Sequence, residues 1–149
     1  IEDPGVLKIL LFRRNRLKTF ISEQLARQTD RWEAYAREDL ATVTPRLHVD
    51  VESFKAHCDL NESFYQEIEE ALRSGQQSCI ETAYEDILTG SEQARLLEFL
   101  GVEAPDTKLT QASVKQSNRD LRTHIKNFQE LELALDGSEY LMELYDNEN

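Results

Sequence analysis

Residues 6–22 read VLKILLFRRNRLKTFIS and change from apolar to basic halfway along. The first part, residues 6–12, is apolar except for Lys8 and follows the turn-forming residues Asp3, Pro4 and Gly5. A short apolar run bounded by turn residues is typical of a strand that is covered on both faces in a parallel sheet. The sequence therefore predicts a central strand over residues 6–12.

Helical periodicity begins directly after this strand. Mostly apolar and aromatic residues recur at short helical intervals and predict one amphipathic helix from about Arg16 to Leu40. They are Leu17, Phe20, Ile21, Leu25, Trp32 and Tyr35, with the polar Gln28 at the same spacing. Pro45 breaks this pattern, and residues 42–54 can include a short extended piece. One or two further helices are expected over residues 51–72, with Gly75 as their C-terminal cap.

A second strand is expected in SCIETAYEDIL, residues 78–88, which alternates in polarity before a loop at Gly90. A short helix should follow and end at Gly101, and two more helices are expected near Asp120–Leu135 and Ser138–Tyr145. This order predicts an α/β fold, rich in helix, with a partial parallel sheet flanked by helices. Val6–Phe12 and about Cys79–Tyr84 should be parallel neighbours. The chain length, 149 residues, favours a single domain over residues 1–149.

The composition excludes several classes of partner. With 17 lysine and arginine residues against 29 aspartate and glutamate residues, the net charge is -12, which repels nucleic acid and anionic membranes. No apolar run approaches the roughly 20 residues of a membrane span. Cys58 and Cys79 are far apart and form no CxxC pair, which favours free thiols in a cytoplasmic protein. No metal is expected, because Glu85 and Asp86 would point to opposite faces of a strand.

The basic cluster Arg13, Arg14, Arg16 and Lys18 needs a small, local partner in so acidic a chain. Arg14 follows the predicted strand, and ligands of open α/β sheets bind outside the carboxyl ends of the strands. Ser22 lies two helical turns further on, and the helix start would add unpaired N–H groups that favour a phosphate. Two interpretations remain open from the residues alone: a phosphate site at Arg14 and Ser22, or a solvated helix start.

The segment ILLFRRNRLKTFIS resembles the 3′-phosphate-binding segment of sulfotransferases that use 3′-phosphoadenosine-5′-phosphosulfate (PAPS). The shared pattern is an apolar strand, then Arg14-Asn15, then Ser22 eight residues after the arginine. The segments AYEDIL, LLEFLGV and SNRDLRTHIKNFQELELAL follow in the family's order, so the resemblance covers most of residues 6–136 and is strongest to the bacterial carbohydrate and lipid branch.

This resemblance implies a P-loop NTPase-like sulfotransferase fold with PAPS as the cofactor. Arg14 and Ser22 would bind the 3′-phosphate, and Lys115, Arg119 or Arg122 could supply a second cation to the nucleotide. The five glycines are isolated, so the sequence contains no glycine-rich cradle for the 5′-phosphosulfate. The chain is therefore expected to be the C-terminal part of a sulfotransferase domain and to be inactive alone.

The implied reaction transfers a sulfonate group from PAPS to a hydroxyl acceptor, a carbohydrate or a small molecule. The catalytic base is unknown; His48, His57 and His124 are expected to be non-catalytic, because no neighbouring residue would orient them. Two other functions remain open. One is a catalytically inactive relative that binds protein or glycan, and the other is an acidic helical interaction module. The sequence identifies neither the acceptor nor the oligomeric state.

Overall fold

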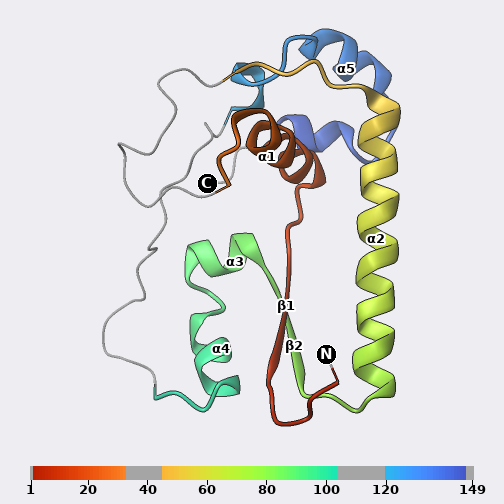
Figure 1. The fold of residues 1–149 in the computed structure, drawn as a ribbon. Helices are drawn as coiled ribbons and strands as arrows, with labels where there is room; N and C mark the ends of the chain where they lie inside the picture. The colour runs from red at the N-terminus through yellow and green to blue at the C-terminus, as the bar shows by residue number, and fades with distance from the viewer. Residues whose placement is uncertain (1, 33–44, 104–119, 147–149) are drawn as a thin grey trace. The chain divides into compact units, whose positions relative to one another are not determined.

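The computed structural model describes residues 2–32, 45–103 and 120–146, which form an α/β structure rich in helix (Figure 1). Its elements in chain order are β1 Lys8–Phe12, α1 Arg16–Thr29, α2 Val51–Ser74, β2 Cys79–Ala83, α3 Tyr84–Thr89, α4 Gln93–Phe99, the 3₁₀ helix η2 Leu121–Thr123, α5 Phe128–Ala134 and the 3₁₀ helix η3 Leu141–Leu144.

The chain divides into two compact units, which are described separately. The sheet unit comprises Ile1–Arg14 and Leu60–Gln111, and the helical unit comprises Asn15–Asp59 and Ala112–Asn149. Helix α2 contributes residues to both units. The expectation of a single domain over residues 1–149 stays a prediction.

The sheet consists of β1 and β2, which pair in parallel from Lys8↔Cys79 to Phe12↔Ala83. This confirms the predicted pairing of the two apolar segments. The second strand is shorter than predicted, because residues 84–88 belong to α3. Acidic side chains in the first turn stabilise a helix start, and α3 begins with Glu85 and Asp86 in that turn. Gly90 ends the helix in the left-handed conformation, with a φ of 82°.

Strand β1 is covered on one face rather than on both. Leu10 is buried, whereas Ile9 and Leu11 are 42% and 46% exposed within the described structure. The prediction that both faces are covered is therefore wrong for the residues described. Helix α2 contacts the strand through Tyr65, whose hydroxyl donates to the Leu11 carbonyl at 2.8 Å.

The hydrophobic core of the helical unit forms around Phe54 of α2, which is fully buried. Its ring meets the ring of Phe20 edge-on at 5.7 Å and that of Tyr140 at 5.1 Å. This core is completed by the apolar face of α1, by Val49 and Cys58 before and within α2, and by residues of the C-terminal region. They are Leu17, Phe20, Ile21, Leu25, Val49, Cys58, Leu121, Ile125, Leu131, Leu135 and Leu144. The amphipathic character predicted for the first helix is confirmed over α1.

Helix α1 ends earlier than predicted. Asp30 adopts the left-handed conformation with a φ of 53°, and its N–H donates to the Ala26 carbonyl, which stops the helix after Thr29. Trp32 is 61% exposed and outside the helix, so its predicted place on a buried helical face is wrong. Residues 33–44, including Tyr35, lie outside the described residues.

The region predicted as one or two helices after Pro45 is the single helix α2. Its C-terminal turn closes differently from the prediction, because the left-handed residue is Gln76, with a φ of 49°, and not Gly75. Gly75 still donates its N–H to the Ala71 carbonyl at 3.0 Å.

The predicted helix over Asp120–Leu135 is interrupted by an extended segment. Leu47 forms an isolated parallel bridge with Ile125, in which its N–H donates to the His124 carbonyl and its carbonyl accepts from the Lys126 N–H, both at 2.7 Å. This confirms the extended piece expected within residues 42–54 and explains the break between η2 and α5. The predicted helix over Ser138–Tyr145 is reduced to η3.

The side chain of Asn127 stabilises this bridge through two hydrogen bonds to the main chain of Val49. It accepts one from the Val49 N–H and donates one to the Val49 carbonyl, each at 2.9 Å. Val49 is buried, so Asn127→Ala would leave two buried backbone groups without these partners. We expect this variant to lower the free energy of unfolding by about 1–3 kcal/mol in urea denaturation. The control Gln129→Ala, at an exposed position of α5, should change it by less than about 0.5 kcal/mol. Equal effects would contradict this role of Asn127.

Candidate anion-binding site

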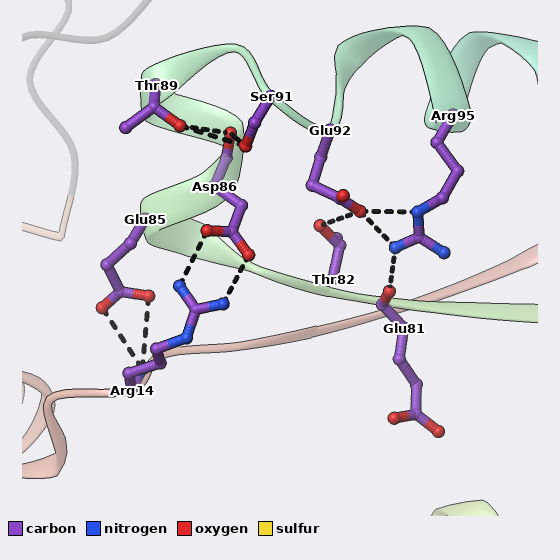
Figure 2. Close-up of polar contacts among 9 residues, drawn as sticks. All are labelled: Arg14, Glu81, Thr82, Glu85, Asp86, Thr89, Ser91, Glu92 and Arg95. Carbon is purple, nitrogen blue, oxygen red and sulfur yellow. Dashed lines mark hydrogen bonds and ion pairs between the residues drawn. The ribbon is translucent and has the colours of Figure 1, made fainter.

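The candidate site of the sheet unit lies where both strands end. Because β1 and β2 run parallel with Phe12 opposite Ala83, the residues that follow them meet at one edge of the sheet. Figure 2 shows the guanidinium of Arg14 facing the carboxylate of Asp86 in α3. The Arg14 Nη1–Asp86 Oδ1 distance is 2.8 Å and the Nη2–Oδ2 distance is 2.5 Å. This is a bidentate ion pair, the geometry in which arginine also binds phosphate.

Glu85 contacts the same end of β1 through the main chain. Both oxygens of its carboxylate accept the Arg14 N–H, at 3.2 and 3.3 Å. One of them also lies 3.9 Å from Nε of Arg13, whose guanidinium stacks over the Tyr84 ring. The expectation that Glu85 and Asp86 point to opposite faces is wrong, because they stand in the first turn of a helix. Together they hold the basic end of β1.

A second ion pair beside this one involves α4. Nε of Arg95 donates to Glu92 Oε2 at 2.6 Å, and its Nη2 donates to the main-chain carbonyl of Glu81 in β2. Figure 2 shows the Glu81 side chain pointing away from this pair. Glu92 thereby adds a third carboxylate to the end of the sheet at which Arg14 lies.

Both partners of the Arg14–Asp86 pair have shifted pKa values. The hydrogen bond to Arg14 lowers the pKa of Asp86, and the hydrogen bond to Asp86 raises the pKa of Arg14. The charges of Glu85 and Glu92 raise the Arg14 pKa further. Both groups are therefore charged at neutral pH, and Arg14 is neutralised from within the chain.

Main-chain N–H groups at the start of α1, in the helical unit, also donate to side chains of the protein. Asn15 is buried and its Oδ1 accepts the Lys18 N–H at 2.8 Å. The Glu143 carboxylate accepts the Leu17 N–H at 2.8 Å and Nε of Arg16 at 3.0 Å. The expectation that the helix start offers unpaired N–H groups to a phosphate is therefore wrong for Leu17 and Lys18.

Arg16 is consequently a structural residue of the helical unit. Its Nη2 lies 3.0 Å from Glu139 Oε2, and its guanidinium stacks over the Tyr140 ring at 4.4 Å. Burial alone would lower the pKa of Arg16, but hydrogen bonds to Glu139 and Glu143 raise it above its usual range. Part of the basic cluster thus stabilises the fold.

The other predicted site residues are placed separately. Ser22 is exposed on α1 and belongs to the helical unit, whereas Arg14 belongs to the sheet unit, so their predicted convergence stays a prediction. The guanidinium of Arg122 lies 5.3 Å from the ring centroid of Phe128 and 5.7 Å from that of Tyr145. Lys115 and Arg119 lie outside the described residues.

His57 has an acidic neighbour that the local sequence does not reveal. Its Nδ1 lies 3.4 Å from Glu23 Oε2 of α1, and its ring meets the Phe20 ring edge-on at 5.2 Å. His48 lies 3.9 Å from exposed Glu130, and His124 is buried. The expectation that all three histidines are non-catalytic stays a prediction.

Within residues 2–32, 45–103 and 120–146, no group of three histidine, cysteine or acidic side chains could hold a metal ion. In the same part of the chain, every helix is too short or too polar to cross a membrane. The two cysteines are free, and burial raises the pKa of the Cys58 thiol to about 11.

Comparison with known proteins shows similarity to curated relatives called Nodulation protein H. The chain is 29% identical over 141 residues to the protein of Rhizobium meliloti, an alignment that covers 92% of this chain and 55% of the relative. It is 27% identical over 136 residues to the protein of Rhizobium tropici, covering 90% and 53%. The chain spans about half the length of these relatives. No family model and no solved structure matches the sequence.

The Arg14–Asp86 pair predicts a specific acid dependence of stability. The pKa of Asp86 is lowered in the folded protein, so its contribution is complete above the unfolded value of about 3.9 and is lost as the pH falls through the folded value. The difference in unfolding free energy between wild type and Asp86→Asn should therefore be largest at neutral pH and shrink below about pH 4. Urea denaturation across this range measures it.

Glu98→Gln, at an exposed position of α4, is the matched control that also removes one carboxylate. We expect its difference from wild type to be small at every pH. A wild-type advantage over Asp86→Asn that stayed constant between neutral pH and pH 2 would show that the ion pair does not stabilise the folded protein.

Proposed function

We propose that this chain is part of a sulfotransferase that uses PAPS and transfers its sulfonate group to a hydroxyl acceptor. The observation that carries this proposal is the position of Arg14 at the carboxyl end of a parallel strand, followed by Asn15 and by Ser22 on the next helix. The similarity to the Nodulation protein H relatives over about 90% of this chain also favours a sulfotransferase.

The residues at the end of β1 fit the 3′-phosphate of such a nucleotide. The Arg14 side chain is 55% exposed, so a ligand can reach its guanidinium, whose planar donors suit a phosphate. The Ser22 hydroxyl, exposed on α1, would add one hydrogen bond. When bound, PAPS would supply the sulfonate group, whose bond to the nucleotide phosphate breaks as a bond to the acceptor oxygen forms.

The two residues contribute differently to this binding. A charge-assisted bidentate contact from Arg14 should contribute more to binding than a neutral hydroxyl contact from Ser22, because charged hydrogen bonds are about twice as strong as neutral ones. Arg119 and Arg122 remain candidates for a second cation on the nucleotide. In the described structure Arg122 already stacks on two aromatic rings, which would hold its guanidinium in a fixed place.

The acceptor is proposed to be a carbohydrate or a small molecule that presents a hydroxyl group. Its proton must pass to a base as the new bond forms, and no residue of the chain is assigned that role. We also propose a cytoplasmic location, which the free thiols of Cys58 and Cys79 support.

Calorimetry on the complete protein tests the nucleotide assignment. Wild type should bind adenosine 3′,5′-bisphosphate more tightly than adenosine 5′-monophosphate, because only the former carries a 3′-phosphate for Arg14. Arg14→Ala should weaken binding of the bisphosphate by about tenfold or more, and Ser22→Ala by about fivefold. Both variants should leave binding of the monophosphate almost unchanged.

Arg13→Ala is the matched control, since it removes an adjacent arginine whose guanidinium packs against Tyr84 and Glu85. It should keep most of the preference for the bisphosphate. If wild type binds the two nucleotides equally, the assignment of Arg14 and Ser22 to a 3′-phosphate is wrong, and the basic cluster serves only the internal ion pairs.

Residues 1–149 alone should show no sulfotransferase activity. The five glycines of the chain are isolated, so its sequence contains no glycine-rich cradle for the phosphosulfate. Loss of groups that stabilise transferring charge costs orders of magnitude in rate. The measurement is transfer of labelled sulfonate from PAPS to a panel of carbohydrate and phenolic acceptors. Turnover by this chain would show that its catalytic groups lie among residues 1–149.

A further inference from the structure

Arg14 stands among three carboxylates, of which Glu85 also lies near Arg13 and Glu92 is paired with Arg95. Asp86 takes both of its terminal nitrogens, Glu85 accepts its main-chain N–H, and Glu92 lies close enough to raise its pKa (Figure 2). A phosphate that approached Arg14 would meet the repulsion of Asp86 at short range, whereas Arg13 and Arg95 partly offset the charges of Glu85 and Glu92. Asp86 also occupies the two-nitrogen edge of the guanidinium that a bidentate phosphate contact uses.

A ligand can nevertheless replace Asp86 as the partner of Arg14. The Arg14 and Asp86 side chains are 55% and 32% exposed, and an exposed ion pair contributes little net free energy because water competes for both charges. A phosphate monoester carries a charge of about -1.5 to -2 at neutral pH, against a single charge on a carboxylate. A monoester can therefore replace Asp86 on Arg14, whereas a singly charged anion gains little by doing so.

We propose that Asp86 is an internal competitor of the nucleotide, occupying Arg14 until a doubly charged 3′-phosphate displaces it. This inference rests on the proposed function and adds a specificity-determining residue to it. Asp86 lowers the affinity for every anion at Arg14, so that weakly held singly charged anions no longer bind measurably whereas a doubly charged phosphate still does. In the absence of such a ligand, the pair also keeps a strand-end arginine neutralised.

An alternative role for Asp86 would be to position Arg14 for the phosphate. In that arrangement the phosphate binds the remaining donors of a guanidinium that Asp86 holds still, and removal of Asp86 lowers affinity. Removal of Asp86 raises the affinity for the phosphate if Asp86 competes with it and lowers the affinity if Asp86 positions Arg14. A single binding measurement therefore separates the two roles.

The test is calorimetric titration of the complete protein with adenosine 3′,5′-bisphosphate, comparing wild type with Asp86→Asn. Asparagine keeps the size of the side chain and removes its charge. We expect binding to become about two- to fivefold tighter, in line with the small worth of an exposed ion pair. Titration with inorganic sulfate, which also carries two negative charges, should likewise show tighter binding to Asp86→Asn than to wild type.

Two further variants make the result specific. Glu98→Gln removes one carboxylate from an exposed position of α4 and should leave both affinities within the error of the measurement. In the double variant Arg14→Ala with Asp86→Asn, the gain should disappear, because the competition acts through Arg14. Far-ultraviolet circular dichroism and the urea midpoint establish that each variant is folded before titration.

The outcomes distinguish this inference from the proposed function. Unchanged or weaker bisphosphate binding by Asp86→Asn, with the wild-type preference for the bisphosphate intact, overturns the competitor role and leaves the proposed function standing. Equal binding of the bisphosphate and adenosine 5′-monophosphate by both proteins overturns the proposed function together with this inference. A gain that survives in the Arg14→Ala background would show that Asp86 acts through general charge and not through Arg14.

Discussion

The parallel register of β1 and β2 determines what meets at the candidate site. With Phe12 opposite Ala83, the arginines that continue the first strand face the acidic turn that opens α3 after the second. An antiparallel pairing would place these two continuations at opposite edges of the sheet. The ion pair of Arg14 with Asp86 and the main-chain contact of Glu85 are therefore consequences of strand direction, and so is the competition that a bound anion would face.

Arginines in both units form ion pairs with carboxylates of the same chain. In the sheet unit Asp86 neutralises Arg14, and in the helical unit the Glu143 carboxylate accepts both Nε of Arg16 and the N–H of Leu17. A carboxylate at that place satisfies donors that a helix start otherwise leaves open and complements its positive end. Arg16 thus stabilises the fold. Arg14 is half exposed and its ion pair is weak, so a ligand can replace Asp86 as its partner.

The sequence predicts those features that depend on local pattern. The apolar run before Arg13 and the spacing of Leu17, Ile21 and Leu25 give β1 and α1, and the order of segments gives the parallel pairing. Local pattern does not predict contacts between residues that are far apart in the sequence. Glu143 lies 127 positions from Arg16, and the bridge with Leu47 makes the chain extended at Ile125 where the sequence predicts a helix. Residues that follow two parallel strands lie at one edge of the sheet, so the sequence alone can bring Arg14 and Asp86 together. The expectation of a strand that includes residues 84–88 conceals the pair, because these residues belong to α3.

The division of the chain between the units bears on how the protein folds during synthesis. The chain passes from the sheet unit to the helical unit after Arg14, returns after Asp59, and leaves again after Gln111. Neither unit is therefore a continuous stretch of sequence that could be expressed by itself. Strand β1 leaves the ribosome 71 residues before its partner β2, and such distant pairings form slowly. Until then its apolar side chains Ile9, Leu10 and Leu11 are available to other nascent chains and to chaperones.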